Sequence, residues 1–408
     1  MDKAALTKYA RLIVKVGVNL KPGEGAIVAF NSEALPLVRE LSAVLYEEGA
    51  RDVILRMTDD AVTLAKYNFG HEEIFDYYPD FDVDFIDRAY SANYHRIAIS
   101  SPNPELLKGV DKERQTRSQK AMLKATERLD HHMDSGRLKW VVAAYPSTEW
   151  ARQVFPDLTA GAAVDKLWEK IAESVRLNTA DPVKAWEDHD RELKFRETWL
   201  DEQNFKRIRF EGPGTDISVH LAEHHKWIGG SSQTPDGVKY MANMPTEEIF
   251  TAPHAQRVNG YLRATKPLSV MGNMVEDFSF IFKDGRVVEF TARKNGEVLE
   301  SLMKLDEGAC RLGEVALVPD SSPVSTAGIL FKNTLFDENA SCHFALGNSY
   351  AETIVGGSGM TEAERTALGG NKSMIHIDFM VGGPDVHVTG YTFDGSEIPV
   401  MRNGEWVV

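Results

Sequence analysis

The chain of 408 residues is long enough for two or three domains, and its composition is that of a folded globular protein. Hydrophobic residues make up 43% and charged residues 26%, which argues against a disordered or fibrous chain. The formal charge of −15 argues against nucleic-acid and anionic-membrane partners, since both call for basic surface. No apolar run approaches the roughly 20 residues of a membrane-spanning helix. Only Cys310 and Cys342 occur, so we expect no disulfide framework and a cytoplasmic location.

Residues 1–200 alternate between helix and strand patterns. The chain begins with an amphipathic helix that ends between Gly17 and Pro22. Further helices are predicted over 34–49 and 147–154, and strands over 25–30, 52–57, 95–100 and 138–146. A strand, a helix and a second strand in succession predict a parallel pair. We therefore expect an α/β amino-terminal domain with an open, mostly parallel sheet. No phosphate-binding glycine pattern follows these strands, so a nucleotide site is not indicated.

After residue 200 the patterns become those of a β-rich domain. A charged helix over 181–204, with Trp186, Leu193, Phe195 and Trp199 spaced for a partly buried face, leads into it. The stretch 205–223 reads as strand, turn and strand, and 277–293 reads as a hairpin that turns at 283–285. We place the domain boundary at residue 200, with an amino-terminal domain over 1–200 and a β-rich α+β carboxy-terminal domain over 201–408.

One short motif match is rejected on its local pattern. The run from His220 to His224 fits the H-x-x-E-H motif of inverted zinc peptidases, which needs both histidines on one face of a helix. Here polar and apolar residues alternate directly after a turn, which predicts a strand. A five-residue pattern with two open positions also arises easily by chance.

A more informative anomaly is a pair of polar residues in the apolar stretch 371–388. His376 and Asp378 share one face of the predicted strand, and the apolar residues around them occupy the other. Burying an unpaired carboxylate costs on the order of several kcal/mol. An Asp–His hydrogen bond, a nearby arginine or a metal ion would each offset that cost.

Three further segments place ionisable groups beside predicted strands: Glu247 and Glu248 in 243–254, Glu314 in 311–319, and His343 with Tyr350 in 335–350. Each is weak alone, because single glutamates are normally solvated and single histidines are normally hydrogen-bonded core residues. Three carboxylates with two neutral imidazoles would nearly neutralise two divalent ions. Mixed oxygen and imidazole ligation suits zinc, cobalt or manganese. Spacing alone does not show that these residues meet.

Several of these segments resemble a known family. "NMPTEEIFTAP", "LFDENASCHFALGNSY" and "IHIDFMVGG" are similar to signature segments of the aminopeptidase T and aminopeptidase S family of dinuclear metalloaminopeptidases. "KYARLIVKVGVNLKPGE" and "AAYPSTEWA" extend the resemblance over most of the chain. The resemblance implies a catalytic Tyr350 and five metal ligands: Glu248, Glu314, His343, His376 and Asp378. Every position holds the expected residue type, so an active enzyme is expected.

The resemblance also implies how the enzyme works. It predicts a metal-dependent aminopeptidase that removes amino-terminal residues from peptides with a hydroxide bridged between two divalent ions, with zinc, cobalt, manganese and magnesium as the candidates. Glu314 or Asp378 would bridge the metals, because a carboxylate has two oxygens. Tyr350 would donate a hydrogen bond to the developing oxyanion, or act as an acid if the cations lower its pKa. Glu247 could support the metal ligands from behind, although a position at the surface is favoured. Peptides with a free amino terminus and a homodimer are the implied partners.

Other interpretations are kept as alternatives. Cys342 beside His343 suggests a cysteine protease, although on an extended backbone the two side chains would point apart and a small buried hydrophobe explains the cysteine equally well. The same ligands would serve a dinuclear amidohydrolase or phosphoesterase. A non-enzymatic α/β binding protein would use the polar cluster as a buried ion-pair network. His131 and His132 are expected in a polar loop, and His254 and His387 receive no role.

Overall fold

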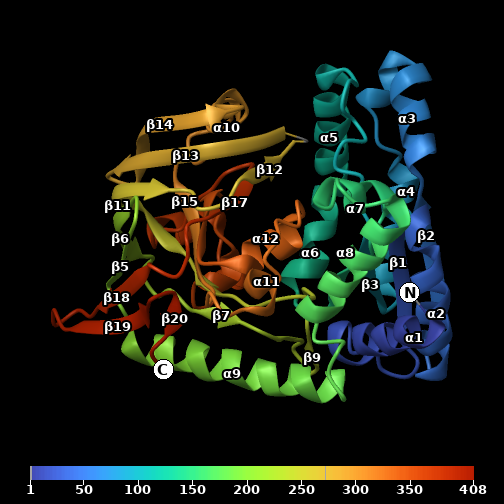
Figure 1. Ribbon diagram of the computed structural model, residues 1–408, viewed down its shortest axis with the longest axis horizontal. Coiled ribbons are helices and arrows are strands. Elements are labelled where there is room, and N and C mark those ends of the chain that lie inside the picture. The colour runs from blue at the N-terminus through green and yellow to red at the C-terminus, as the bar shows by residue number, and fades with distance from the viewer. Residues whose placement is uncertain (1, 272) are drawn as a thin grey trace. The chain divides into compact units, whose positions relative to one another are not determined.

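The computed structural model describes residues 2–271 and 273–408, which divide into two compact units (Figure 1). The first unit contains the chain up to Trp186 together with Ser231–Met244, and the second contains Glu187–Gly230 and Pro245–Val408. The predicted boundary at residue 200 lies inside helix α9 (Pro182–Gln203). Whether 1–200 and 201–408 each fold by themselves stays a prediction.

The first unit is built on a parallel sheet with the strand order β2-β1-β3-β4. Its strands are β1 (Gly25–Asn31), β2 (Asp52–Thr58), β3 (Tyr94–Ser100) and β4 (Trp140–Ala144). A separate two-stranded ribbon joins β8 (Ser232–Gln233) to β9 (Lys239–Tyr240). The predicted parallel pairing of 25–30 with 52–57 is confirmed. The α/β amino-terminal fold with an open parallel sheet is therefore correct.

Helices connect these strands, and several begin at side chains that cap them. The α-helices of the first unit are α1 (Lys3–Leu12), α2 (Leu35–Glu47), α3 (Asp60–Phe69), α4 (Asp80–Ser91), α5 (Lys112–Thr126), α6 (Asp130–Asp134), α7 (Thr148–Val154) and α8 (Ala160–Ser174). Short helical turns are η1 (Ile13–Gly17), η2 (Ser32–Ala34), η3 (Glu72–Phe75) and η4 (Glu127–Leu129). Asp59 accepts hydrogen bonds from the backbone of Ala61 and Val62 at the start of α3. His131 and His132 lie on α6, so their predicted placement in a loop is wrong.

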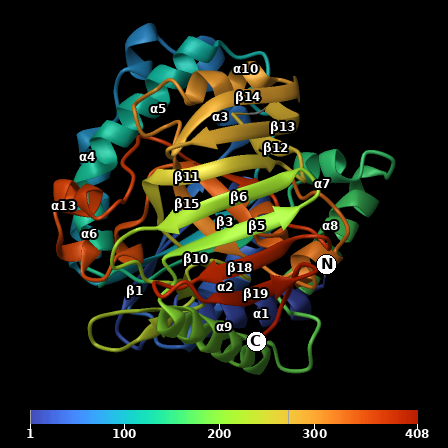
Figure 2. The same ribbon diagram turned by 90° about the vertical axis from the view of Figure 1, so that its left-hand side faces the viewer.

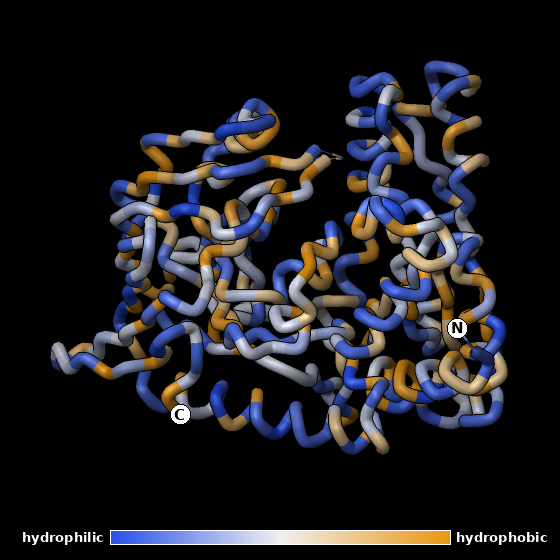
Figure 3. Tube along the Cα trace, viewed as in Figure 1, coloured by the Kyte–Doolittle hydropathy of each residue, from blue (hydrophilic) through white to orange (hydrophobic). Residues whose placement is uncertain are grey.

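Helix α9 is amphipathic along its length, and Figure 3 shows blue segments interrupted by orange ones along it. Trp186 belongs to the core of the first unit, whereas Leu193 and Leu200 belong to the core of the second. Trp199 packs against that second core as predicted. Phe195 is 61% exposed, so its predicted place on the buried face is wrong. No helix among the described residues is long and apolar enough to cross a membrane.

The second unit contains a nine-stranded sheet, drawn face on in Figure 2. Its order is β12-β13-β11-β6-β5-β18-β19-β20, and β14 also pairs with β13. The strands are β5 (Arg207–Gly212), β6 (Thr215–Leu221), β11 (Pro253–Arg263), β12 (Leu268–Val270), β13 (Asn273–Lys283), β14 (Arg286–Lys294), β18 (His387–Tyr391), β19 (Glu397–Arg402) and β20 (Glu405–Trp406). The predicted hairpins β5–β6 and β13–β14 are both present.

A five-stranded antiparallel sheet completes the second unit, with the order β17-β16-β15-β10-β7. Its strands are β7 (Ile228–Gly229), β10 (Ile249–Thr251), β15 (Leu312–Leu317), β16 (His343–Gly347) and β17 (His376–Met380). One face of this sheet packs on the nine-stranded sheet, where Phe344 meets Phe210 at 5.0 Å and Phe379 meets Phe280 at 5.0 Å between ring centroids. Packed aromatic side chains of this size dominate the apolar burial of a core.

Short helices occupy the loops of the second unit. They are α10 (Gly296–Leu302), α11 (Pro323–Thr326), α12 (Thr334–Asp337), η5 (Glu338–Ala340), η6 (Ala351–Thr353), η7 (Gly357–Gly359) and α13 (Glu362–Ala367). The β-rich α+β carboxy-terminal region predicted from the sequence is thus confirmed. With one face of the five-stranded sheet used for the core, its other face is available for ionisable side chains.

Candidate metal centre

Four neighbouring strands of the five-stranded sheet bring the predicted ligands together. His376 and Asp378 lie on β17, His343 opens β16, Glu314 lies on β15, and Glu248 directly precedes β10. In the strand register Ala345 faces both Glu314 and Asp378 across the ladder. Because side chains alternate across a strand, this register puts the polar residues on one face. Ile377 and Phe379 point into the core instead, as predicted.

A β-bulge next to Glu314 sets the direction of its side chain. Leu312 pairs with Leu346 and Glu314 pairs with Ala345, so Gly313 is an extra residue in β15. A Cβ atom on Gly313 would lie 2.2 Å from the carbonyl oxygen of Gly347, a distance that no side chain tolerates. Bulges of this kind often occur beside active sites, where they re-aim one side chain. The "RLGEV" sequence thus uses glycine to present Glu314 to its neighbours.

The two histidines are held in the same way, by backbone carbonyls. His376 donates its Nδ1–H to the carbonyl oxygen of Asn348 at 2.8 Å, and His343 donates its Nδ1–H to that of Ser341 at 3.2 Å. Because a carbonyl can only accept, each Nδ1 carries a proton, and in the neutral ring each Nε2 is the nitrogen with the lone pair. Metal-binding histidines are commonly oriented by such a bond from the other ring nitrogen.

Each Nε2 atom is flanked by two carboxylate oxygens. His343 Nε2 lies 3.1 Å from Glu248 Oε2 and 3.4 Å from Glu314 Oε1. His376 Nε2 lies 3.6 Å from Glu314 Oε2 and 3.2 Å from Asp378 Oδ1. Donor atoms arranged tetrahedrally about 2.1 Å from one ion would be about 3.4 Å apart. Glu314 therefore takes part in two groups of potential ligands, Glu248–Glu314–His343 and Glu314–His376–Asp378.

The chemistry of the cluster fits divalent cations. His343 Nε2 and Asp378 Oδ1 are buried, and neither has a hydrogen-bond partner among the described residues. Buried polar atoms are rarely left in this state, so each such atom calls for an explanation. Divalent cations bind imidazole nitrogens and carboxylate oxygens, so a cation in each group of potential ligands would satisfy the buried atom of that group.

The pKa values of Glu314, His343 and His376 are raised, as expected where buried acids lie close together. Burial, added to the charges of the neighbouring acids, raises the pKa of Glu314 to about 7. Burial alone would lower the pKa of His376, but the charge and contact of Asp378 raise it to about 9. Burial opposes the charge of His343 too, yet the adjacent Glu248 and Glu314 raise its pKa well above the ordinary value. Protons thus compensate part of the negative charge.

Tyr350 lies at the border of the cluster, just after β16. Its ring is 4.7 Å from that of His376 and 6.0 Å from that of Phe250, measured between centroids. The residue is 44% exposed. Burial of the hydroxyl, followed by the charges of Glu314 and Asp378, raises the pKa of Tyr350 above its ordinary value. The hydroxyl is therefore a neutral donor.

Comparisons with known proteins show which family the chain is similar to. Residues 2–406 match the family described as thermophilic metalloprotease (M29). Aminopeptidase 2 of Geobacillus stearothermophilus is 41% identical over 401 residues, covering 98% of this chain and 97% of that protein, and aminopeptidase T of Thermus aquaticus is 39% identical over 403 residues, covering 99% and 98%. The solved structure of wild-type AmpT from Thermus thermophilus superposes with a TM-score of 0.94 at 39% identity and full coverage of both chains.

The chain belongs to the M29 thermophilic metalloprotease family. The family resemblance read from the sequence is confirmed, and this M29 metalloprotease is a metal-dependent peptide hydrolase.

The structure adds one acidic residue that the sequence reasoning missed. Glu338, on η5, is surrounded by the other acids: burial raises its pKa well above the ordinary value, and the charges of Glu248 and Asp378 raise it further. Its only signal in the sequence is its place five residues before His343, in the segment that carries the family resemblance. A glutamate in a helical turn gives no sign of which way it points.

Glu247 was expected at the surface, and that prediction is wrong. Its side chain is 3% exposed, and its Oε2 lies 3.5 Å from Nε2 of His189. The backbone N–H of Glu247 donates to Oδ1 of Asn339 at 2.7 Å, and the Asn339 amide also donates to the carbonyl of Leu335. Asn339 thus ties the backbone beside Glu248 to the turn that carries Glu338.

The structure argues against both the rejected zinc-peptidase motif and the cysteine-protease alternative in this M29 metalloprotease. His220 lies on strand β6, not on a helix, so the inverted zinc-peptidase motif is absent there. Cys342 belongs to the hydrophobic core, and burial raises the pKa of its thiol to about 11, which is the opposite of an activated nucleophile. Both cysteines are free.

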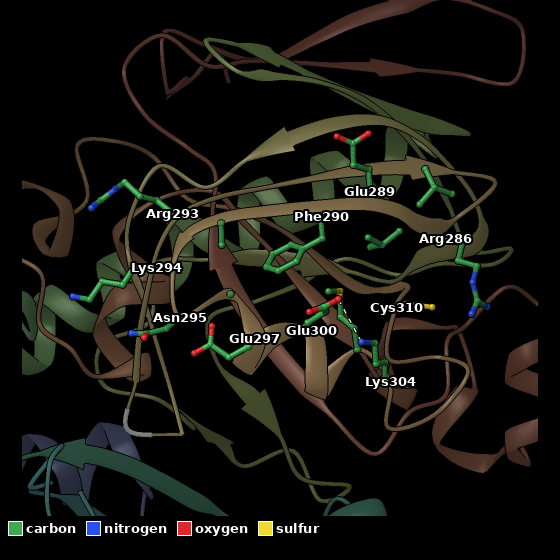
Figure 4. Close-up of a pocket in the computed structure, with 15 residues that line it drawn as sticks. Arg286, Glu289, Phe290, Arg293, Lys294, Asn295, Glu297, Glu300, Lys304 and Cys310 are labelled. Carbon is green, nitrogen blue, oxygen red and sulfur yellow. Dashed lines mark ion pairs between the residues drawn. The ribbon is translucent and has the colours of Figure 1, made fainter.

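A hollow of about 640 Å³ in the second unit is separate from the cluster. It lies between β14 and α10, and charged side chains of both signs surround Phe290 and Cys310 (Figure 4). None of the predicted site residues lines it. The hollow therefore does not mark the candidate metal centre, which is defined by its donor atoms.

Proposed function

We propose that this M29 metalloprotease is an aminopeptidase that uses two divalent metal ions held by Glu248, Glu314, His343, His376 and Asp378. The observation that carries the proposal is the position of Glu314, whose two carboxylate oxygens face different histidines at 3.4 and 3.6 Å. A carboxylate shared in this way is what a pair of ions requires, because each oxygen then serves one ion.

The ligands divide into two sets around that shared carboxylate. Glu248, His343 and Oε1 of Glu314 would hold one ion, and His376, Asp378 and Oε2 of Glu314 would hold the other. Of the two bridges considered from the sequence, Glu314 is favoured, since Asp378 belongs to one set alone. Two imidazole nitrogens among oxygen ligands favour zinc or cobalt, with manganese next, over magnesium, which prefers oxygen and water.

The side chains around these ligands suggest how the reaction is served. Bound divalent ions would supply Lewis acidity and lower the pKa of a water molecule at the site. Tyr350 offers a neutral hydroxyl whose hydrogen bond would strengthen as negative charge develops on the substrate carbonyl oxygen. Glu338 belongs to neither ligand set, so its carboxyl group is our candidate for carrying a proton to the leaving amine.

The substrate would be a peptide with a free amino terminus. Relatives of about 40% identity carry the name aminopeptidase, and two of them are called aminopeptidase T. The negative charge of this chain, −15, and the acids of the cluster would attract a positively charged terminal amine.

A cytoplasmic homodimer is part of the same proposal. Two free, buried cysteines are what a reducing compartment leaves in a protein. Exposed apolar side chains on the first unit, including Met57, Phe69 and Phe81, provide surface that a second copy could cover. A monomer in sedimentation velocity at micromolar concentration would contradict the dimer.

Replacing Glu314 with Gln tests the function. This centre should hold about two zinc or cobalt ions per chain, and the protein's cleavage of aminoacyl anilides should disappear on chelation and return on adding either metal. Glu314→Gln should lose the metal bound at this centre and lower kcat/KM by at least about 100-fold. Glutamine is uncharged and has one side-chain oxygen, whereas the two ligand sets share both oxygens of Glu314. Glu289→Gln, at an exposed position on β14, is the matched control and should behave as the parent.

Two results would contradict the proposal. Full anilide cleavage in Glu314→Gln would show that the shared carboxylate is not part of the site. Cleavage of phosphate esters without cleavage of aminoacyl anilides by the metal-loaded protein would assign the centre to a phosphoesterase.

A further inference from the structure

We propose that Asp87, His131 and His132 form a second, separate site for a divalent transition-metal ion in the first unit. Asp87 lies on α4, and the two histidines are adjacent residues on α6. His132 is 45 residues from Asp87 along the chain. Their donor atoms, one from each residue, all lie within 4.8 Å of one another. None of the three takes part in the centre described above, whose ligands belong to the second unit.

The distances fit one shared ion. His132 Nε2 is 2.7 Å from Asp87 Oδ1, and His131 Nε2 is 3.9 Å from the same oxygen. These values lie on either side of the spacing of about 3.4 Å expected for donors of a tetrahedral zinc ion. Small side-chain rotations would equalise them, since Asp87 and His131 are 38% and 64% exposed.

The tautomer of His131 is already the one that a metal needs. Its Nδ1–H donates to the carbonyl oxygen of Arg128 at 2.7 Å, which leaves Nε2 with its lone pair on the side of Asp87. His132 is fixed as well, because Tyr90 packs edge-on against its ring at 5.4 Å and the two imidazoles lie 3.9 Å apart between centroids. Ring orientation by a backbone carbonyl is typical of metal-binding histidines.

A simple ion pair does not account for the whole arrangement. The His132–Asp87 contact alone would satisfy the carboxylate, and it lowers the pKa of Asp87 together with the charges of His131 and Arg128. This ion pair does not explain the position of His131, because its Nε2 lies 3.9 Å from Asp87 Oδ1, which is beyond hydrogen-bond distance. The positive charge of Arg128 would repel a metal ion at this site, but its guanidinium is paired with the carboxylate of Asp84.

The ligand set defines the class of ion. Two imidazole nitrogens and one carboxylate oxygen suit zinc, nickel or copper and are a poor match for calcium or magnesium. Three protein ligands leave positions for water, and the exposure of His131 provides access from solvent. A bound ion would link α4 to α6, so it would stabilise this part of the first unit without taking part in peptide hydrolysis.

Zinc binding by the metal-loaded enzyme and three variants tests the site. The parent should bind one zinc ion beyond those lost in Glu314→Gln, and the Glu314→Gln protein should keep that extra ion. His131→Ala removes one donor and leaves the Asp87–His132 pair intact, so it should weaken the extra zinc by at least 10-fold while kcat stays unchanged. His71→Ala, an exposed histidine of the same unit, should bind like the parent.

Copper(II) used alone as a probe gives an independent readout of the ligands. The electron paramagnetic resonance spectrum of the Glu314→Gln protein should show coupling to two imidazole nitrogens, reduced to one in the Glu314→Gln/His131→Ala protein. Equal zinc stoichiometry and affinity in His131→Ala and the parent would overturn the proposal, as would the absence of any extra ion. Neither result would affect the centre at Glu314.

Discussion

Buried ionisable side chains are the feature of this protein that needs most explanation at the scale of single residues. One cluster holds three acids and two histidines, namely Glu248, Glu314, Asp378, His343 and His376, and Glu338 adds a further carboxyl group. Without cations the charge is compensated by protons, which is why the pKa of Glu314 rises to about 7 and that of His376 to about 9. A buried charge is tolerated only when a partner or a proton compensates it.

The hydroxyl of Tyr350 can be tested by itself. Tyr350→Phe keeps the ring beside His376 and Phe250 and removes only the donor. We expect kcat to fall by about 100- to 1000-fold, as is common when one oxyanion donor is lost, with metal content unchanged. Steady-state kinetics on aminoacyl anilides with metal analysis of the same samples would measure this. A variant with parental kcat would remove Tyr350 from the mechanism.

At the scale of secondary-structure elements, the centre depends on strand register. A shift of one residue along a strand would turn every side chain to the opposite face. Four adjacent strands must therefore be in register for the ligands to meet, and the bulge at Gly313 makes the final adjustment for Glu314. Asn339 adds a tie between the backbone at Glu247 and the turn at Glu338.

Replacing Gly313 with Ala should damage the centre more than the fold. The new Cβ would lie 2.2 Å from the carbonyl oxygen of Gly347, so the backbone must move and displace Glu314. We expect a loss of about 1–3 kcal/mol in the free energy of unfolding and a fall of about 100-fold in kcat/KM, which misplacement by 1 Å can cause. Urea unfolding and anilide kinetics would measure the two effects.

Gly359→Ala provides the control for that variant, because no atom lies within 4 Å of the added Cβ and its backbone is not in the left-handed region. It should change neither stability nor activity appreciably. If Gly313→Ala retained parental activity, the bulge would not be what orients Glu314.

At the scale of the whole molecule, the cluster links metal binding to pH. The pKa of His376 is raised from 6.5 to about 9 and that of Glu314 from 4.5 to about 7 in the folded chain. A group with a raised folded pKa stabilises the fold below its unfolded pKa, and that contribution is lost as pH rises through the folded pKa. The metal-free protein should therefore lose stability between about pH 5 and pH 9 as these protons leave.

Bound metal should reverse that trend, because a cation replaces the protons that the cluster releases. We expect the difference in melting temperature between zinc-loaded and chelated protein to widen from pH 6 to pH 9. An ion at a hundredfold excess over its dissociation constant adds about 2.7 kcal/mol. Thermal unfolding followed by circular dichroism at several pH values measures this difference. A difference that narrowed with rising pH would contradict the assignment of protons to the ligand atoms.

Local pattern was sufficient to predict the strands of the parallel sheet and two of the hairpins. Alternation predicted the hairpins β5–β6 and β13–β14, and strand–helix–strand order predicted the parallel sheet of the first unit. The failures have a common physical cause. Phe195 has the spacing of a buried residue but is exposed on α9. Glu247 was expected at the surface but is buried against His189. Burial depends on what packs against a side chain, which the local sequence does not contain.

The sequence by itself determined the residue types at the centre and, through long similar segments, the protein family. It also placed His376 and Asp378 on one face of a strand, because side chains two residues apart along a strand point to the same side. Only the tertiary structure decided that Glu314 presents its oxygens to two different histidines and that Glu338 joins the cluster. The physical reason is that these contacts join β15, β16, β17 and η5, and their distances are set by strand register and a bulge, which form only when the chain folds.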